Sequence, residues 1–270
     1  MADGTVHLER RGKVAVVTLD RPERKNALGQ HLWHALGRVA DELAAALPRA
    51  VVVTGAPPAF CAGMDVNPDN PQVARLVGAV AARDVGPARA MLDELHGVLD
   101  RLFALPVPLI AAIGGLAYGG GAELAARCDL RVADPAAILC FSEVRLGLMP
   151  DLGGGVALTR LVGPGRAADL ILTARKVDAA EALRLGLVNR VSDPGASVDA
   201  AVALGEQIAG NGPRAVRAAL AVIRRGADLP WRDAVAAEVD AAAHLIASGE
   251  CEAGIAALFG KTAPDFVDPT

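Results

Sequence analysis

Aromatic residues and paired cysteines are scarce in this chain of 270 residues. Phe, Trp and Tyr together make up 3% of the sequence, whereas hydrophobic residues make up 53%. Small aliphatic side chains must therefore fill the core, so that backbones can approach one another closely. The four cysteines form no CxxC pair and have no histidine at metal-ligand spacing, which excludes the common zinc motifs. We expect no metal site, and reduced cysteines that pack as small hydrophobic residues: Cys61, Cys128, Cys140 and Cys251.

An excess of basic charge is also absent. The formal net charge is −4 and the isoelectric point is about 5.8, so the chain lacks the electrostatic footprint of a protein that binds nucleic acid or an anionic membrane surface. Residues 1–12 are polar, unlike a secretory signal, and no apolar run reaches the roughly 20 residues that span a bilayer. We therefore expect a cytoplasmic protein with no nucleic-acid or membrane partner.

Two nucleotide-binding motifs are missing from the most glycine-rich part of the chain, VPLIAAIGGLAYGGGAELAARCDLRVAD over 107–134. It contains no GxGxxG in the frame of a dinucleotide fold and no Gly-Lys-Ser/Thr of a P-loop. The pattern predicts a buried strand, a glycine loop, a helix with Glu123 in its first turn, and a second strand. Such a loop lets backbone N–H groups approach a ligand. It favours either a site where negative charge develops on an oxygen beside a proton-transfer group, or merely a tight turn in a packed core.

Hydrophobic periodicity predicts an α/β fold with several layers. An antiparallel hairpin is expected over 5–20, and a buried strand over 50–55. Between them we expect a helix over 28–47 with Asn26 as its N-cap. From 67 to 90 the periodicity is lost among prolines, and we interpret this segment as a mobile, irregular cover over a pocket.

Later segments complete this picture. Helical periodicity returns over 91–105, and Asp178 is expected to cap a short helix that Gly186 closes. Residues 197–270 have a helical pattern and end in a polar tail. We therefore divide the chain into a core over 1–196 that carries the site and a helical C-terminal region over 197–270.

Five short motifs follow one another along almost the whole chain: RPERKNAL (21–28), FCAGMD (60–65), IGGLAYGGGAELAARCD (113–129), FSEVRLGLMPDLGG (141–154) and GLVNRV (186–191). In this order and spacing they resemble the crotonase superfamily, the enoyl-CoA hydratase/isomerase family. The resemblance implies a crotonase-like spiral of ββα units, with a helical C-terminal region that assembles homotrimers or hexamers made of two trimers. It implies an acyl-CoA thioester substrate and no cofactor beyond the coenzyme A that the substrate carries. Gly114 is a departure, since the family often has Asn there.

The resemblance also implies a chemistry for named residues. The backbone N–H groups of Met64 and Gly120 would form an oxyanion hole that stabilises a thioester enolate. Glu123 and Glu143 lie at the positions of the two glutamates that bind a water molecule in hydratases and add it across the 2,3 double bond of a 2-enoyl-CoA. We expect Glu123 to act as the base toward water and Glu143 as the proton donor at Cα.

Asp151 leaves alternatives open. It replaces the small residue of typical hydratases, and in this family a carboxylate here serves isomerases, so the chain is also compatible with an enoyl- or dienoyl-CoA isomerase that uses Asp151 and Glu143. A purely structural interpretation is that Asp151 caps a helix starting near Gly153. Further alternatives are a hydrolase or dehalogenase of the superfamily and a non-catalytic acyl-CoA-binding member. The intact Glu123 and Glu143 disfavour both.

The resemblance finally places coenzyme A against the first two motifs. Backbone groups of these turns would contact the coenzyme, with Arg24 or Lys25 near its phosphates. Lys261 resembles a lysine that reaches a phosphate from the C-terminal helices, from the same or a neighbouring subunit. The residues implied in coenzyme A binding are Arg24, Lys25, Ala27, Ala62, Gly63, Asp65 and Lys261.

Overall fold

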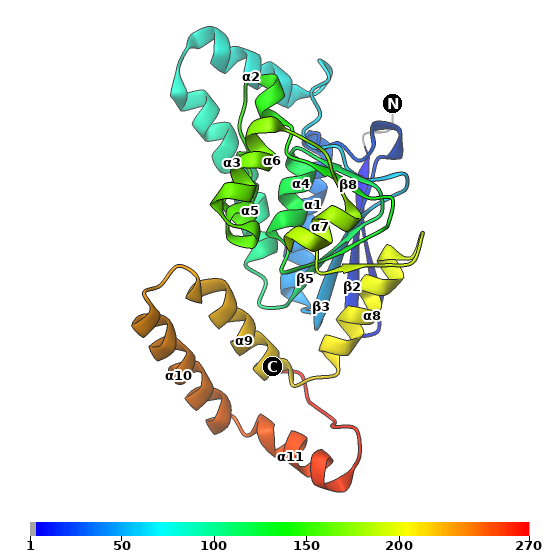
Figure 1. The fold of residues 1–270 in the computed structure, drawn as a ribbon, viewed down its shortest axis with the longest axis vertical. Helices are drawn as coiled ribbons and strands as arrows, with labels where there is room; N and C mark the ends of the chain where they lie inside the picture. Colours follow the sequence, from blue (N-terminus) through cyan, green and yellow to red (C-terminus); the bar gives the residue numbers. More distant parts are fainter. Residues whose placement is uncertain (1–3, 270) are drawn as a thin grey trace.

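The computed structural model describes residues 4–269, so the first three residues of the polar N-terminal stretch lie outside it. A six-stranded sheet with the order β1-β2-β3-β5-β7-β10 forms its largest layer (Figure 1). The predicted hairpin is confirmed, since β1 (Thr5–Arg11) pairs antiparallel with β2 (Val14–Asp20) along its whole length. All other pairs in this sheet are parallel, and their strands are β3 (Ala50–Gly55), β5 (Leu109–Ile113), β7 (Leu130–Ala133) and β10 (Arg190–Val191).

A second sheet contains four short strands: β4 (Ala59–Cys61), β6 (Leu116–Tyr118), β8 (Ile138–Cys140) and β9 (Val177–Asp178). The successive strand pairs β3–β4, β5–β6 and β7–β8 each give one strand to each sheet. Equivalent strands of successive pairs run parallel, and a helix follows each pair. This repetition confirms the α/β fold as a crotonase-like spiral of ββα units.

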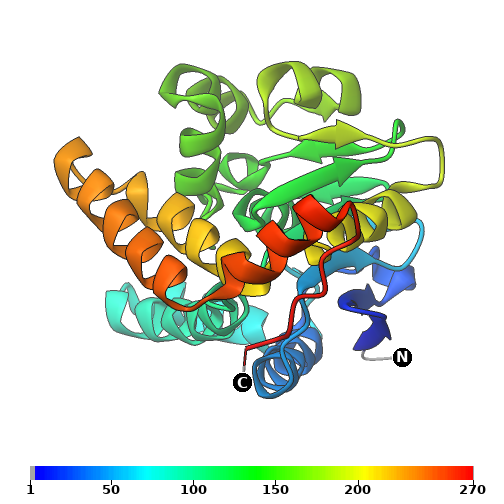
Figure 2. The ribbon, with the colours of Figure 1, turned by 90° about the horizontal axis from the view of Figure 1, so that it is seen from below.

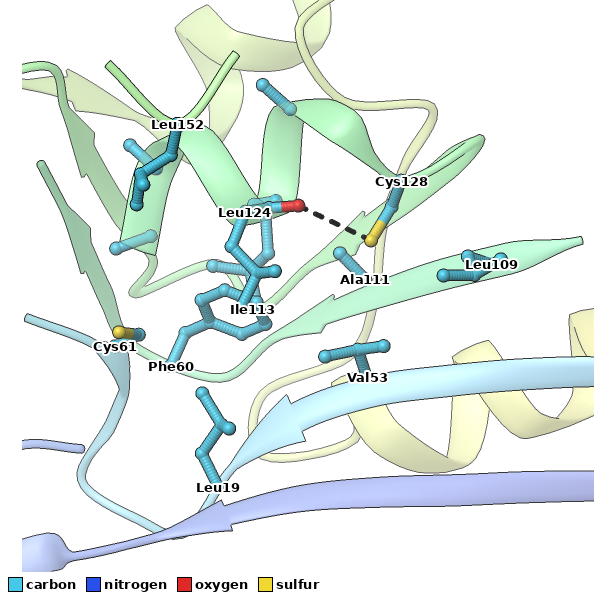
Figure 3. Packing of buried hydrophobic residues seen from close by; sticks show 14 of the residues in the cluster. Leu19, Val53, Phe60, Cys61, Leu109, Ala111, Ile113, Leu124, Cys128 and Leu152 are labelled. Atoms are coloured by element: carbon cyan, nitrogen blue, oxygen red, sulfur yellow. Dashed lines mark hydrogen bonds between the residues drawn. The ribbon is translucent and has the colours of Figure 1, made fainter. Parts of the chain in front are cut away.

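Both faces of the sheet are covered at its central strands β2, β3 and β5, which explains why these strands are nearly continuous apolar runs rather than alternating ones. Val16, Val52 and their neighbours face helix α8 (Ser197–Ala209) in a smaller core. The alternate residues Ala15, Val17, Val51 and Val53 face the main core, where Figure 3 shows Val53. This packing fixes the register of each strand, because a shift by one residue would exchange the two faces.

Small side chains fill the main core, as the shortage of aromatic residues predicts. Cys61 and Cys128 lie among its leucines and alanines, and Cys128 Sγ donates to Leu124 O at 3.5 Å (Figure 3). Burial raises the pKa of the Cys61 thiol to about 12, so this group stays protonated. Cys140 is buried as well, whereas Cys251 is exposed.

The interpretation of 67–90 as an irregular segment is wrong. It forms α2 (Pro71–Ala82) and the beginning of α3 (Val85–Phe103). Pro71 occupies the first helical position, where the missing N–H has no intrahelical partner to lose. Asn70 caps α2 by accepting from Gln72 N, and Asp84 caps α3. Pro71, which looked like a helix breaker, therefore starts a helix.

The expected cap at Asn26 is also wrong. The first helix, α1 (Gln30–Ala45), begins after Gly29 and follows a short 3-10 helix η1 (Pro22–Arg24). Asn26 has a φ of 58°, and its side-chain amide donates to Ala56 O and Ala59 O, each at 2.7 Å. Asn26 therefore ties the first motif to the β3–β4 connection.

The prediction around residue 178 is confirmed. The Asp178 carboxylate accepts from Glu181 N at 2.7 Å at the start of α7 (Ala179–Leu185), and Gly186 ends that helix with a φ of 77°. The remaining helices of the core are α4 (Gly120–Arg127), the 3-10 helix η2 (Glu143–Leu146), α5 (Gly154–Val162) and α6 (Pro164–Thr173).

Residues beyond α8 form an arm that projects from the core (Figures 1 and 2). Its helices are α9 (Pro213–Gly226), α10 (Trp231–Ala247) and α11 (Glu250–Gly260), which confirms the helical pattern of this region. The tail after α11 returns to the core, where Arg49 pairs with Asp268 at 2.6 Å and donates to Phe266 O. None of the helices within residues 4–269 is both long and apolar enough to cross a membrane.

Candidate active site

Glu123 lies in the first turn of α4, where the chain leaves β6 through Gly119. Its side chain is fully buried, with 0% exposed. Glu123 Oε2 accepts hydrogen bonds from Leu152 N and Gly154 N, each at 2.9 Å. Its Oε1 accepts from Asp151 N at 3.3 Å. Three backbone amides therefore orient this carboxylate and favour its ionised form.

Glu143 begins η2, directly after β8 and Ser142. It is 9% exposed, and neither carboxylate oxygen has a hydrogen-bond partner among residues 4–269. A Cβ atom added to Gly119 would lie 3.5 Å from Glu143 Oε1, so this carboxylate lies against the loop that starts α4. The two predicted glutamates therefore reach one place from two junctions of the spiral, one held by amides and the other without a partner.

Burial and the charge of a neighbouring carboxylate raise the pKa of both carboxyl groups, Glu143 acting on Glu123 and Asp151 acting on Glu143. Desolvation and the negative charge of Glu143 raise the pKa of Glu123 to about 7, and the hydrogen bonds from Gly154 N and Leu152 N limit this rise. Desolvation also raises the pKa of Glu143. Because the charge of Glu143 disfavours ionisation of Glu123, the coupled pair retains a proton close to neutral pH.

The two backbone amides expected to form an oxyanion hole lie side by side. A Cβ atom on Gly120 would be 3.8 Å from Met64 N. Within the part of the chain that the structure describes, neither amide donates a hydrogen bond. Leu28 N donates to Gly63 O at 2.7 Å, and Asp65 N donates to Leu28 O at 3.2 Å, which fixes the backbone around the first amide. The second amide belongs to the N-terminus of α4, where unpaired N–H groups and the helix dipole favour negative charge.

A cavity of about 110 Å³ opens beside these groups. Its polar part is formed by Glu123, Glu143, Asp151 and the two amide-bearing residues. Its apolar wall comes from four elements and consists of Trp33 on α1, Leu76 on α2, Met91, Leu92 and Leu95 on α3, and Leu146, Leu148 and Met149 around η2. Residues 67–90 therefore do cover a pocket as predicted, but as helices. The cavity thus places an apolar wall beside the carboxylates of Glu123, Glu143 and Asp151.

Asp151 lines the same cavity and does not cap α5. The N-cap of α5 is Gly153, and the carboxylate that accepts from the amides at this helix start is that of Glu123. The interpretation of Asp151 as a helix cap is therefore wrong. Desolvation and the charge of Glu123 raise the pKa of Asp151 to about 6.

The turns expected to hold coenzyme A meet in the structure. Ala62 N donates to Lys25 O at 2.9 Å, which joins the first motif to the second. The Asp65 side chain is buried and pairs with Arg21 at 2.6 Å, its N–H donates to Leu28 O and its carbonyl accepts from the Asn70 side chain, so that the polar groups of Asp65 are bonded within the chain. Arg24 lies 3.5 Å from Asp69.

Lys261 does not join this site within one chain, since it directly follows α11 at the end of the arm far from α2 (Figure 1). No group of three or more His, Cys, Asp or Glu side chains in residues 4–269 is placed to hold a metal ion.

Sequence reasoning missed three residues of this region. Trp33 is a cavity wall, and as one of only two tryptophans it could have been singled out by its rarity. His96 and Arg127 contact the loop before α5, where His96 Nε2 lies 2.7 Å from Asp151 O and Arg127 Nη1 donates to Leu152 O at 2.9 Å. Arg127 lies within the motif over 113–129, which assigns it no role, and His96 lies in none of the five motifs.

Known proteins resemble this chain over its whole length. The model of the enoyl-CoA hydratase/isomerase family matches residues 9–269. A short-chain-enoyl-CoA hydratase from Clostridium acetobutylicum is 37% identical over 251 residues, which cover 91% of this chain and 88% of the relative. An enoyl-CoA hydratase from Polaromonas sp. JS666 superimposes with a TM-score of 0.87 at 29% identity, over 98% of this chain and 100% of the other. An enoyl-CoA hydratase from Bacillus anthracis gives a TM-score of 0.86 at 31% identity, over 97% and 98%.

Proposed function

The chain belongs to the enoyl-CoA hydratase/isomerase family, and we propose that it is an enoyl-CoA hydratase that adds water syn across the 2,3 double bond of a 2-enoyl-CoA. One observation carries this proposal. Glu123 and Glu143 meet at one cavity in contrasting surroundings, the first anchored by amides and the second unpartnered. Hydration needs such a pair, because one group must take a proton from water while another supplies a proton to carbon.

The oxyanion hole prepares the substrate. Met64 N and Gly120 N would donate to the thioester oxygen as attack at Cβ moves charge onto it. Because both donors are fixed by the backbone before the substrate arrives, they need little reorganisation during the reaction. Loss of one such donor typically costs about 3 kcal/mol of transition-state stabilisation.

The surroundings of the glutamates support distinct roles. The amides of Leu152 and Gly154 favour an ionised Glu123, which would accept a proton from the attacking water. Glu143 lacks such donors and would carry the proton that is delivered to Cα. A proton on Glu143 also removes the charge that raises the pKa of Glu123. After the addition, transfer of the proton from Glu123 back to Glu143 would restore the starting state.

The test follows the ultraviolet absorbance of the conjugated thioester in crotonyl-CoA and longer 2-enoyl-CoA substrates. The wild type is expected to remove the chromophore by hydration. Glu123→Gln and Glu143→Gln are each expected to lower kcat by about 10²- to 10⁴-fold. Glu206→Gln, at an exposed position on α8, is the matched control and should retain full activity. Retention of the chromophore by the wild type with every substrate would refute the proposal.

A second candidate is an enoyl- or dienoyl-CoA isomerase, favoured by the position of Asp151 in the cavity. In this reaction Asp151 and Glu143 would move a proton between carbons of the acyl chain. The discriminating substrates are 3-enoyl and 3,5-dienoyl thioesters. The isomerase would be established instead if the wild type converts these substrates but does not hydrate crotonyl-CoA, and if Asp151→Asn abolishes the conversion.

We also propose that the arm in the C-terminal region assembles the chain into homotrimers or hexamers. Helix α10 has no buried residue, and large apolar side chains of the arm are exposed, among them Trp231 at 84% and Phe259 at 83%. Assembly would cover them, and it would allow Lys261 to reach the coenzyme A bound near Lys25 of another subunit. Light scattering after gel filtration would test this, and a monomer at micromolar concentration would contradict it.

A further inference from the structure

Two side chains outside the cavity hold the loop that holds Glu123. His96, on α3, has its Nε2 atom 2.7 Å from Asp151 O. A carbonyl oxygen can only accept, so Nε2 carries the hydrogen and donates it. Arg127, the last residue of α4, donates from Nη1 to Leu152 O at 2.9 Å. Two consecutive carbonyl groups of the loop are thus each fixed by a side chain from a different helix.

The amides of the same loop point to Glu123. The Asp151 carbonyl and the Leu152 N–H belong to one peptide group, and a peptide group is planar. A donor that fixes Asp151 O therefore also fixes the direction of Leu152 N, which lies 2.9 Å from Glu123 Oε2. Arg127 fixes the next peptide group, between Leu152 and Gly153, by donating to Leu152 O. The amide after it, Gly154 N, also donates to Glu123 Oε2.

Helix α3 is the common support of both contacts. Arg127 is itself held by α3, since its Nη2 lies 3.2 Å from Asp100 Oδ1 and its guanidinium lies 4.3 Å from the centre of the Phe103 ring. The same helix supplies Met91 and its neighbours to the apolar wall of the cavity. One helix therefore connects the acyl-chain wall to the orientation of the Glu123 carboxylate.

We propose that His96 is a positioning residue for Glu123, and that Arg127 supports it through the adjoining peptide group. The proposal rests on the proposed function in one respect, namely that Glu123 is the base toward water. His96 does not touch the reacting atoms. It aligns the Leu152 amide, so that the carboxylate is held in one orientation and its ionised form is stabilised.

The charged groups around Glu123 define the test. Glu143 on η2 and Asp151 on the loop before α5 interact with Glu123 directly. His96 on α3 and Arg127 on α4 contact carbonyl groups of that loop instead, so they are separated from Glu123 by a peptide group. A change at His96 can act through its hydrogen bond or through its charge. His96→Leu removes both, whereas His96→Gln keeps an N–H donor near the position of Nε2 without the ring.

His96→Leu is expected to lower kcat by roughly tenfold with little change in KM, as for one lost hydrogen bond to a positioned group. The acid limb of the pH profile of kcat/KM should move upward by roughly half a unit to one unit, because a misaligned amide no longer favours the ionised Glu123. His96→Gln should restore most of the rate and of the profile. His34→Leu, at an exposed histidine on α1, is the matched control and should leave both unchanged.

Carbon-13 NMR of protein labelled at its glutamate carboxyls measures the pKa of Glu123 without turnover, with the resonance assigned from Glu123→Gln. A higher pKa in His96→Leu but not in His96→Gln supports positioning, even if the wild type hydrates no substrate and the proposed function fails. If the wild type is active and His96→Leu changes neither the pH profile nor the pKa of Glu123, the proposal is overturned. Equal shifts of this pKa in His96→Leu and His96→Gln also overturn it, because they would indicate an effect of charge alone. If His96→Leu does not fold, the proposal requires that Arg127→Met raise the pKa of Glu123, by less than the shift expected for His96→Leu.

Discussion

Glu123 and Glu143 are buried beside the same cavity, but their surroundings differ. Three amides of the loop before α5 surround Glu123, while no donor in residues 4–269 reaches either oxygen of Glu143. Burial alone would make the two carboxyls equivalent acids. The unequal distribution of donors distinguishes them, and in the proposed hydration this difference would prepare Glu123 as the base and Glu143 as the carrier of a proton.

The largest expected effect comes from replacing one of the two glutamates, first Glu143. In Glu143→Gln the charge that raises the pKa of Glu123 is lost, so the acid limb of the residual kcat/KM profile should move to lower pH while the rate falls by about 10²- to 10⁴-fold. In Glu123→Gln that limb should disappear. Steady-state rates measured from pH 5 to pH 9 check both expectations. A limb that stays in place in Glu143→Gln would show that the two groups are not coupled.

A second effect concerns Gly119, the glycine that lies against the Glu143 carboxylate. Gly119 has φ 51° and ψ −126°, a conformation that side chains disfavour, and a Cβ there would meet Glu143 Oε1 at 3.5 Å. Gly119→Ala is expected to lower the free energy of unfolding by about 1–3 kcal/mol and to reduce activity. Urea denaturation checks the first expectation. Gly12→Ala is the control, because its φ is 60° but nothing lies within 4 Å of the added Cβ, so it should be milder and leave activity intact.

A smaller effect appears in stability. The pKa of Glu143 is raised in the folded state above its ordinary value of 4.5 by burial. Such a group contributes stability at low pH that is lost as the pH rises through its folded-state pKa. Glu143→Gln, which has no such loss, should therefore be more stable than the wild type at pH 8 by about 1 kcal/mol. The difference should shrink as the pH falls toward 4.5, and an equal gap at pH 8 and pH 5 in urea denaturation would contradict the argument.

The smallest expected effect is at Asp151. It lines the cavity, but its carboxylate has no part in the proposed hydration. Asp151→Asn should change the hydration rate by less than about threefold, while the backbone amide that reaches Glu123 is preserved. A loss as large as that of the glutamate variants would transfer the proton chemistry to this residue and favour the isomerase.

A layered α/β fold could be predicted because its determinants are local and repeated, whereas the spiral of ββα units was implied only by the family resemblance. Apolar strands, a glycine loop and a short helix recur in the chain, and motif order supplied the rest. Residues 67–90 and Asn26 were mispredicted for physical reasons. Pro71 and Asn70 start a helix as readily as they end one, and Asn26 is bonded to carbonyl groups some 30 residues away in the sequence. Such contacts have no local pattern.

The residue types of the site could be predicted, but the different hydrogen-bond surroundings of its two glutamates could not. The spacing of Glu123 and Glu143 indicated a pair of carboxylates. That only Glu123 is held by amides depends on how the loop before α5 folds against α4, and the sequence shows this only as Leu152 and glycines. The contact of His96 with that loop depends on the packing of α3, which no motif encodes.

The most direct test of the central claim, that two unequal carboxylates add water to an enoyl thioester, is the hydration of crotonyl-CoA and longer 2-enoyl-CoA substrates in D₂O, with the product analysed by NMR. We predict a 3-hydroxyacyl-CoA with one deuterium at Cα, on the face that also receives the hydroxyl group, and no such product from Glu123→Gln. Unchanged substrate, or a shifted double bond without a hydroxyl group, would contradict the account.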